Sequence, residues 1–217
     1  YLFQKYDLTS APVIDESGRL TGMVTIDDVV DVIQEENRED LLALSNVSSA
    51  DALDTVLSTF RSRAPWLAMN VLTAFVASIV ISLFDKTIET IVALAVLMPV
   101  VVALGGNAGS QTLAVSVRAL AERELSGNTT RRAIIREALT ALINGVVFSA
   151  AVAAIAYFWF RDPVLSGVIA VAMLATFLCA GLSGIIIPLT LKRLGADPAV
   201  ASSVFLLTTV DIIGFLS

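Results

Sequence analysis

The sequence contains no histidine and only one cysteine, Cys179, among its 217 residues. The lack of histidine excludes His-based catalysis and His-ligated zinc, and a single cysteine excludes a disulfide framework and a thiolate metal site. Charged residues make up 16% of the chain, whereas soluble domains have about 25%. Hydrophobic residues reach 56%, so most of this chain has too few charges to cover a water-exposed surface.

Basic residues lie beside the hydrophobic segments and form no nucleic-acid footprint, so we expect no nucleic-acid partner. The net charge is −6, with the acids concentrated in residues 7–54 and the bases beside the hydrophobic segments. No signal peptide is visible, because the chain opens without a basic segment before an apolar run. We interpret the sequence as a piece of a longer polypeptide.

The first 63 residues have the composition of a soluble protein. Residues 11–15 and 19–26 predict two strands joined by a turn at Glu16-Ser17-Gly18. A helix is predicted from Asp27 onward, with acidic residues in its first turn. Residues 49–63 predict a second amphipathic helix.

Five hydrophobic segments follow, at residues 66–84, 88–120, 138–160, 164–191 and 199–217. The first has 19 residues, or roughly 28 Å of helix, which spans a hydrocarbon core of about 30 Å. The predicted fold is therefore an all-α polytopic membrane protein with five transmembrane helices. A partial α/β segment and an amphipathic acidic helix precede them.

Basic residues beside these segments predict the orientation, because positive charge marks the cytoplasmic side. The flanks expected on one side contain Arg61, Arg63, Arg123, Arg131, Arg132, Arg136, Lys192 and Arg193, whereas the opposite loops contain only Lys86 and Arg161. We therefore expect a multi-pass protein of the cell (inner) membrane, in contact with lipid, with a cytoplasmic N-terminal region.

The last hydrophobic segment contains one carboxylate, Asp211, near the expected middle of the membrane. A charged residue there costs about 2.5–3.5 kcal/mol on insertion scales, so it usually faces a wet cavity or a cation. One interpretation is a cation site, favoured by the nearby Thr208, Thr209 and Gly214. The other is a protonated structural Asp bonded to a neighbouring helix.

The second hydrophobic segment is interrupted by Pro99 and by Gly105-Gly106-Asn107. Proline removes a backbone hydrogen bond, so we expect this helix to open here or to admit a close neighbour. Asn107, Ser110, Gln111 and Ala114 share one face at helical spacing. That face suits a hydrated cation path, although interhelical packing by small residues and amides remains an alternative.

The predicted N-terminal helix carries an unusual density of acids: Asp28, Asp31, Glu35, Glu36, Glu39 and Asp40. Arg38 is the only basic residue nearby that can compensate their charge. Such a run is usually a solvated face, but these acids repel one another unless cations screen them. A divalent cation that bridges them to another surface, such as the loop with Asp197, would make the helix a sensor.

Several motifs resemble the MgtE family of magnesium transporters and channels. They are Met98-Pro99 with GGNAGSQ at residues 105–111, LGADP at 194–198, and TTVD at 208–211 followed by Gly214. Residues 10–33 resemble the second half of a CBS domain. Residues 33–40 resemble the family's acidic plug helix, from which Asn37 and Arg38 depart.

The resemblance implies a homodimer with one pore on its two-fold axis, and Mg²⁺ as the transported ion. It implies a partial CBS domain at residues 1–34, a plug and connecting helix at 35–63, and a pore domain at 64–217. The implied pore residues are Asp211, Leu207, Thr208, Gly214, Gly105, Gly106, Asn107 and Gln111. The implied Mg²⁺ ligands are Asp211, Asp28, Asp31, Glu36, Glu39, Asp40 and Asp197. ATP at a complete CBS domain, through Thr25 and Asp28, is a further implied partner.

We therefore predict a Mg²⁺-selective channel or transporter that cytoplasmic Mg²⁺ gates through these acids. An ion-coupled secondary transporter of divalent cations is one alternative, since broken helices also occur in that class. An intramembrane aspartyl hydrolase is another, but it needs a second intramembrane Asp. We expect the chain not to be an enzyme.

Overall fold

The structure is a computed structural model that describes residues 2–44, 55–122, 124–125 and 127–217. The side chains of residues 40 and 41 lie outside the described part as well. Its elements are, in chain order, α1 (Leu2–Tyr6), β1 (Ser10–Ile14), β2 (Leu20–Thr25), α2 (Ile26–Leu44), α3 (Val56–Ser82), α4 (Asp85–Thr90), α5 (Val92–Ala121), α6 (Asn128–Phe160), α7 (Pro163–Arg193) and α8 (Pro198–Leu216).

The predicted hairpin is present at the N-terminus. Strands β1 and β2 pair antiparallel, with Ser10 opposite Thr25. In the turn, the Asp15 carboxylate accepts hydrogen bonds from the backbone N–H groups of Ser17 and Arg19, both at 2.9 Å. Gly18 has a φ of +78°, a left-handed conformation that suits glycine. Local turn chemistry therefore accounts for this part of the fold.

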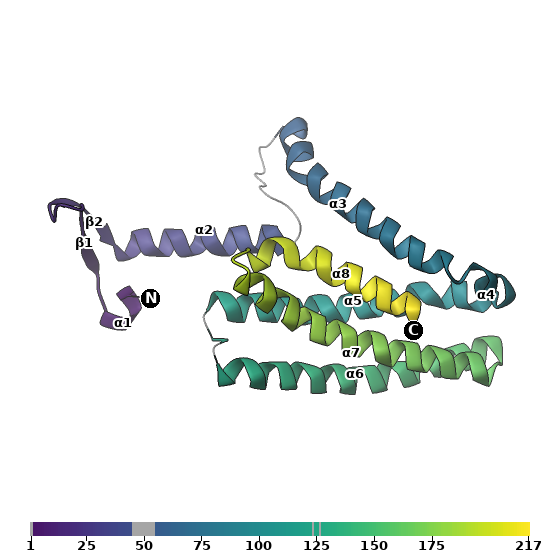
Figure 1. Ribbon diagram of the computed structural model, residues 1–217. Coiled ribbons are helices and arrows are strands. Elements are labelled where there is room, and N and C mark those ends of the chain that lie inside the picture. Colours follow the sequence, from purple (N-terminus) through teal and green to yellow (C-terminus); the bar gives the residue numbers. More distant parts are fainter. Residues whose placement is uncertain (1, 45–54, 123, 126) are drawn as a thin grey trace.

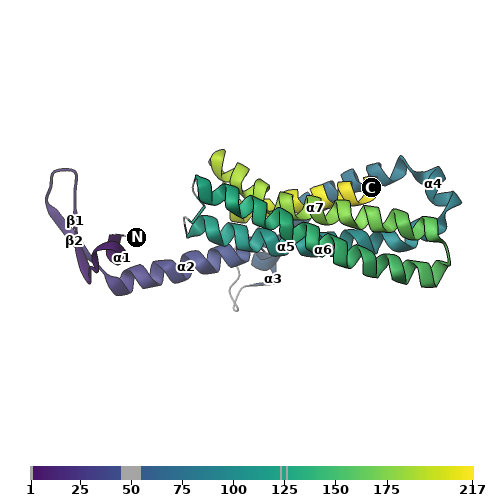
Figure 2. The same cartoon turned by 90° about the horizontal axis from the view of Figure 1, so that it is seen from below.

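Helix α2 projects from the helical bundle and carries the hairpin at its far end (Figures 1 and 2). At its start, Thr25 donates from its backbone N–H and its hydroxyl to Asp28 Oδ2, at 2.8 and 2.7 Å. The same bonds lower the pKa of the Asp28 carboxyl, with the hydroxyl contributing most. The helix runs unbroken across residues 34 and 35, where we predict the end of the partial CBS domain.

In the described part of the chain, five helices are long and apolar enough to cross a membrane: α3, α5, α6, α7 and α8. The predicted fold class is thereby confirmed. Helix α7 is the central one, since half of its most apolar stretch is buried, and it packs against α5, α6 and α8. Helix α3 diverges from the others (Figure 1), and only 6% of its stretch is buried.

Two apolar clusters hold the bundle together. The larger one centres on Met173 and Phe177 of α7, which pack with Leu97 and Val101 of α5 and Ala156 of α6. The second cluster lies nearer the end from which α2 projects. It comprises Leu113, Val117, Ala180, Ala199, Leu206 and Val210, and Ala43 and Leu44 of α2 pack against it. The end of α2 is therefore attached to the bundle by apolar contacts.

The predicted boundary between an amphipathic helix at 49–63 and a first span from Trp66 is wrong. Instead, α3 runs continuously from Val56 to Ser82 through Pro65; residues 49–54 lie outside the described part. Proline is tolerated inside apolar helices where neighbouring groups satisfy the freed carbonyl. The polar and apolar parts of this segment thus form one helix.

Of the two alternatives predicted for the second span, the structure shows the close neighbour and not the opening. Helix α5 continues through Pro99, Gly105 and Gly106. The interruption lies earlier, at Ile91, which separates α4 from α5. The helix stays closed because other helices pack directly on its glycines, as described below.

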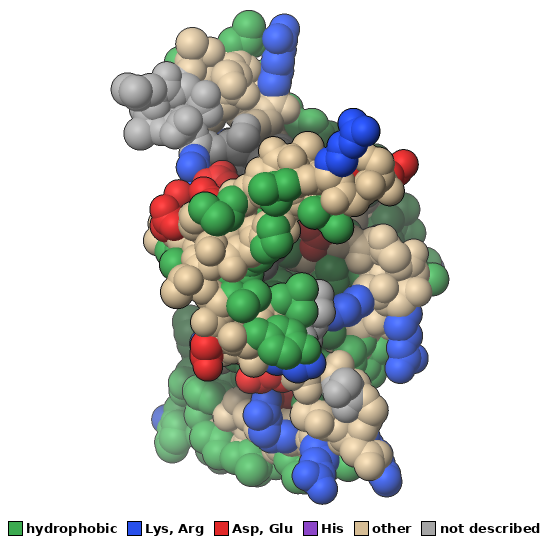
Figure 3. All heavy atoms as spheres, turned by 90° about the vertical axis from the view of Figure 1, so that its left-hand side faces the viewer, with side chains coloured by type: hydrophobic (Ala, Val, Ile, Leu, Met, Phe, Trp, Pro, Cys, Tyr) green, Lys and Arg blue, Asp and Glu red, His purple; other side chains and the backbone are tan. Residues whose placement is uncertain are grey.

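The basic flanks gather at one end of the bundle. The start of α3, the connection from α5 to α6 and the connection from α7 to α8 all lie at this end (Figure 1). Lys192 also donates from Nζ to the Leu120 carbonyl oxygen, at 3.0 Å, and joins the ends of α7 and α5. Figure 3 looks onto this end, where Lys and Arg side chains project around acidic ones. The charge asymmetry predicted from the sequence is therefore present in three dimensions.

Candidate functional site

Helix α8 carries Asp211, and its start is fixed by a helix cap. Asp197 caps its first turn by accepting a hydrogen bond from the Ala199 N–H at 2.8 Å, and Pro198 occupies the first helical position. At about 1.5 Å per residue, Asp211 lies roughly 20 Å along the helix from Pro198. The carboxylate is thus carried well into the bundle.

Asp211 is half-buried, and no hydrogen bond or ion pair to it is found within the described part of this single chain. The described residues therefore offer no bonded partner for the interpretation of Asp211 as a structural residue tied to a neighbouring helix. One turn earlier, the Thr208 hydroxyl donates to the Val204 carbonyl oxygen at 2.7 Å. The Thr208 oxygen keeps acceptor capacity beside Asp211.

Glycines bring α5 against α8 and α7. A Cβ atom added at Gly106 would lie 3.4 Å from Leu207 Cδ2, and one at Gly109 would lie 3.0 Å from Leu206 Cδ1. A Cβ at Gly105 would meet the Thr176 side chain and lie 3.0 Å from Val210 Cγ1. The structure therefore brings Gly105 next to Val210 and Gly106 next to Leu207, both on the helix of Asp211.

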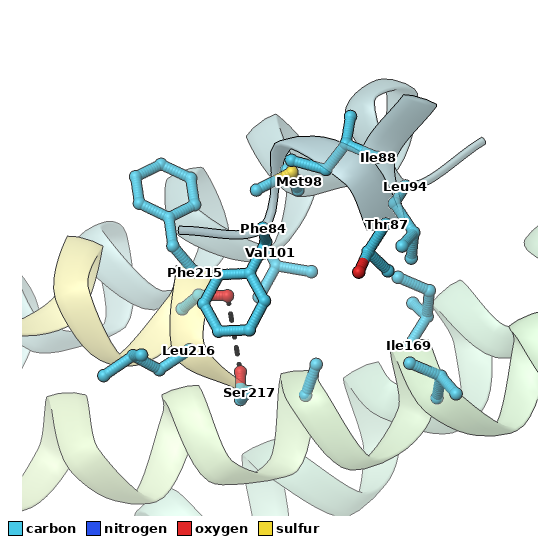
Figure 4. Close-up of a pocket in the computed structure, with 13 residues that line it drawn as sticks. Phe84, Thr87, Ile88, Leu94, Met98, Val101, Ile169, Phe215, Leu216 and Ser217 are labelled. Carbon is cyan, nitrogen blue, oxygen red and sulfur yellow. Dashed lines mark hydrogen bonds between the residues drawn. The ribbon is translucent and has the colours of Figure 1, made fainter. Parts of the chain in front are cut away.

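Gly214 fills a similar role near the end of α8, where a Cβ would lie 3.0 Å from Val102 Cγ2. It also lines an apolar cavity of about 150 Å³ between α4, α5, α7 and the end of α8. Figure 4 shows Phe84, Met98 and Phe215 around this cavity, and the hydrogen bond from the Ser217 hydroxyl to the Gly214 carbonyl oxygen. Because the lining is mostly apolar, we assign no ion to it.

Asn107, Ser110, Gln111 and Ala114 lie on one exposed face of α5, as their spacing predicts. Gly109 and Leu113, which lie between them in the sequence, are buried. Neither Asn107 nor Gln111 forms an interhelical hydrogen bond in the described part of this chain. One subunit therefore leaves the amide face of α5 uncovered.

The described acidic side chains of α2 lie apart from Asp211. Asp28, Asp31, Glu36 and Glu39 are exposed on the projecting helix, and the side chain of Asp40 lies outside the described part. No three acidic, histidine or cysteine side chains come together to hold a metal among the described residues. Among the described residues of a single chain, the Mg²⁺ ligands expected from the sequence are therefore not brought together.

Asp197 has a local structural role that the sequence interpretation overlooked. Beyond capping α8, it lines a cavity of about 220 Å³ with Lys192 and the end of α5. The signal was available, since Asp197-Pro198 before an apolar run is a typical helix start. The Oδ1 oxygen of Asp197 accepts the capping bond.

The sequence interpretation also overlooked Glu137, near the start of α6. Its side chain is only 12% exposed, and it pairs with Arg136 at 3.0 Å. Its other oxygen accepts a hydrogen bond from the Thr112 hydroxyl of α5 at 3.3 Å. The position of Glu137, between several arginines and an apolar segment, could have drawn attention to it, but sequence alone does not reveal that its partner is Thr112.

Comparison with known proteins gives a consistent result for both parts of the chain. Residues 98–217 match the family model MgtE, described as divalent cation transporter, and residues 1–35 match the CBS domain. A protein named magnesium transporter MgtE from Thermus thermophilus is 36% identical over 218 residues, or 99% of this chain and 48% of that protein. A protein of the same name from Bacillus subtilis is 35% identical over 99% of this chain and 48% of its own length. The chain thus spans about half the length of these curated relatives.

Proposed function

The chain belongs to the MgtE family of divalent cation transporters, and on this premise we propose that it forms a Mg²⁺-selective channel or transporter. The family is one of transporters rather than enzymes, and the five apolar helices make the chain a multi-pass membrane protein. The curated relatives are named magnesium transporters, which supports Mg²⁺ as the transported ion.

The position of the Asp211 carboxylate is the observation on which the proposal rests. Its carboxylate is inside a membrane-spanning helix and has no partner within the described part of one chain. Mg²⁺ prefers oxygen ligands in octahedral geometry and gives up its water reluctantly. Asp211 would bind the hydrated ion through its water shell, and the Thr208 oxygen beside it would accept further hydrogen bonds from those waters.

A homodimer completes the proposed pore. The uncovered amide face of α5, with Asn107 and Gln111, suits a second subunit across a water-filled path. A two-fold axis beside α5 and α8 would place two Asp211 carboxylates on one ion, which neutralises the charge that a single subunit leaves unpaired. Selectivity over Ca²⁺ would then come from a pore whose width fits the hydrated Mg²⁺ ion.

The acidic helix α2 is the proposed Mg²⁺ sensor. Its exposed acids are balanced only by Arg38, which pairs with Glu35 at 3.7 Å, so bound cations would reduce their repulsion. Its last residues, Ala43 and Leu44, pack on a cluster that includes Leu206 and Val210 of α8. A change in the position of α2 would therefore be transmitted to the helix that carries Asp211. The basic flanks at this end support a cytoplasmic location for the sensor, in the cell membrane.

Asp211→Asn tests the proposal. Purified protein is reconstituted into liposomes that contain a Mg²⁺-sensitive dye, and Mg²⁺ entry is measured. We expect the variant to lose Mg²⁺ flux while it remains folded and of unchanged oligomeric state. Asp162→Asn is the matched control, because Asp162 caps α7 and asparagine caps equally well. Wild-type flux in Asp211→Asn would contradict the pore role.

The same liposomes distinguish the proposal from an ion-coupled secondary transporter. A channel conducts Mg²⁺ down its own gradient without Na⁺ or H⁺, whereas a coupled transporter requires the second ion. The break at the proline and glycines that suggested this alternative is not present, because α5 is continuous through Pro99, Gly105 and Gly106. Dependence of the flux on a Na⁺ or H⁺ gradient would favour the alternative.

A further inference from the structure

Glu137 is a carboxylate inside the bundle that the proposed function does not use. Its side chain is 12% exposed, whereas that of its neighbour Arg136 is 66% exposed. An ionised carboxylate is costly to remove from water unless other groups pair with it. The groups that pair with Glu137 therefore explain how its carboxylate is stabilised inside the bundle.

Each oxygen of this carboxylate contacts a different helix. Arg136 of α6 donates to Oε1 from Nε at 3.2 Å and from Nη2 at 3.0 Å. The Thr112 hydroxyl of α5 donates to Oε2 at 3.3 Å. In the described part of the chain, this is the one side-chain hydrogen bond that joins α5 to α6. Glu137 thus connects two helices that are otherwise largely separated by α7 (Figure 1).

Two glycines of α7 make this connection possible. A Cβ at Gly184 would lie 2.8 Å from both the Gly109 carbonyl oxygen and Thr112 Cβ of α5. A Cβ at Gly181 would meet Ala141 of α6 and lie 3.5 Å from the Glu137 carbonyl oxygen. Real side chains at these positions would push both helices away from α7. Because glycine has no side chain, α5 and α6 approach α7 closely enough for Thr112 and Glu137 to form a hydrogen bond.

Thr112 adjoins the polar face of α5. Gln111 precedes it, and both residues line a cavity of about 140 Å³ with Glu137 and Asn144. Because a helix rotates as a rigid rod, any rotation of α5 that moves Thr112 also moves Asn107 and Gln111. The hydrogen bond from Thr112 to Glu137 opposes that rotation.

We propose that Glu137 is a positioning residue for cation transport. By accepting a hydrogen bond from Thr112, it fixes the rotation of α5 and hence the direction in which Asn107 and Gln111 face. The carboxylate acts through α5 and does not itself touch the transported ion. This inference depends on the proposed transport function, since it assigns the amide face of α5 to the ion path.

The test measures Mg²⁺ flux and the Mg²⁺ to Ca²⁺ flux ratio of single and double variants in liposomes. Glu137→Ala and Thr112→Val each remove the hydrogen bond, and valine keeps the shape of threonine. We expect each to lower Mg²⁺ flux at least about twofold, the lower end of couplings between contacting residues, and to reduce the flux ratio. The double variant should lose no more than the more impaired single variant, because both changes remove the same bond.

Conservative replacements should restore transport. Thr112→Ser keeps the hydroxyl, and Glu137→Gln keeps an oxygen that can accept it, so both should stay near wild type. Thr190→Val is the matched control, because the Thr190 hydroxyl donates to the Ile186 carbonyl oxygen of its own helix, at 2.8 Å. A change in flux ratio reports on the ion path, which a merely structural contact would leave unaltered.

Three results would overturn the inference. The first is a wild-type flux and flux ratio in Thr112→Val, whose shape preserves folding even where Glu137→Ala misfolds. The second is an additive loss in the double variant, which would show that the two residues act independently. The third is an absence of Mg²⁺ flux in the wild-type protein, which would overturn the proposed function together with this inference.

Discussion

Replacing Gly105 by alanine adds a methyl group where α5 lies closest to α7 and α8. The new Cβ would contact the Thr176 side chain and lie 3.0 Å from Val210 Cγ1. Both neighbours are completely buried, so neither can rotate into open space. The helices must therefore shift to accommodate the methyl group.

The expected cost follows from a comparison with Gly167. Overpacking a buried site costs about 1–3 kcal/mol, while alanine gains up to about 1 kcal/mol over glycine in a helix interior. A Cβ at Gly167 of α7 meets nothing within 4 Å. Gly167→Ala therefore has the same gain in helix propensity but no overpacking cost. We expect Gly105→Ala to be about 1–3 kcal/mol less stable than Gly167→Ala, the range of the overpacking cost alone.

Denaturant unfolding in detergent micelles, followed by circular dichroism, measures the free energies of unfolding of both variants. A second-site change tests the cause. Thr176→Ser removes the methyl group that the new Cβ would meet and keeps the hydroxyl, which donates to the Ala172 carbonyl oxygen at 2.8 Å. Adding it to Gly105→Ala should recover most of the loss. Equal stability of the two alanine variants, or no recovery, would refute the reasoning.

Two further predictions concern α8 and α2. Asp197→Ala removes the cap of α8 and should lower the free energy of unfolding by about 1 kcal/mol, whereas Asp197→Asn should change it little; thermal unfolding distinguishes them, and equal values would contradict the capping role. Replacing Glu36 and Glu39 by glutamine removes two exposed charges of α2 and should raise the Mg²⁺ concentration that inhibits flux from the α2 side. Asp85→Asn, at the opposite end of the bundle, is the control and should leave that concentration unchanged.

Much of the fold was accessible from local sequence. The turn at Asp15 and Gly18 and the start of α8 at Asp197-Pro198 depend on residues close to one another in the chain. The five apolar helices follow from length and hydrophobicity, which do not depend on distant contacts. The shared exposed face of Asn107 and Gln111 follows from helical spacing alone.

Other features depended on residues far apart in the chain. Pro99, Gly105 and Gly106 predicted either an open helix or a close neighbour, and only the structure shows that α7 and α8 pack on these glycines while α5 stays closed. The acids of α2 suggested metal ligands, yet no three such groups meet among the described residues. Local sequence cannot reveal whether a glycine frees the backbone or admits a neighbour.

By itself, the sequence determined that the chain crosses a membrane and that one carboxylate, Asp211, lies within a span, because composition and spacing are local properties. Only the tertiary structure decided what surrounds that carboxylate and which acid connects the helices. The pairing of Glu137 with Thr112 requires two glycines of α7 to bring α5 and α6 together. Such a contact depends on the packing of three helices, and no single segment encodes it.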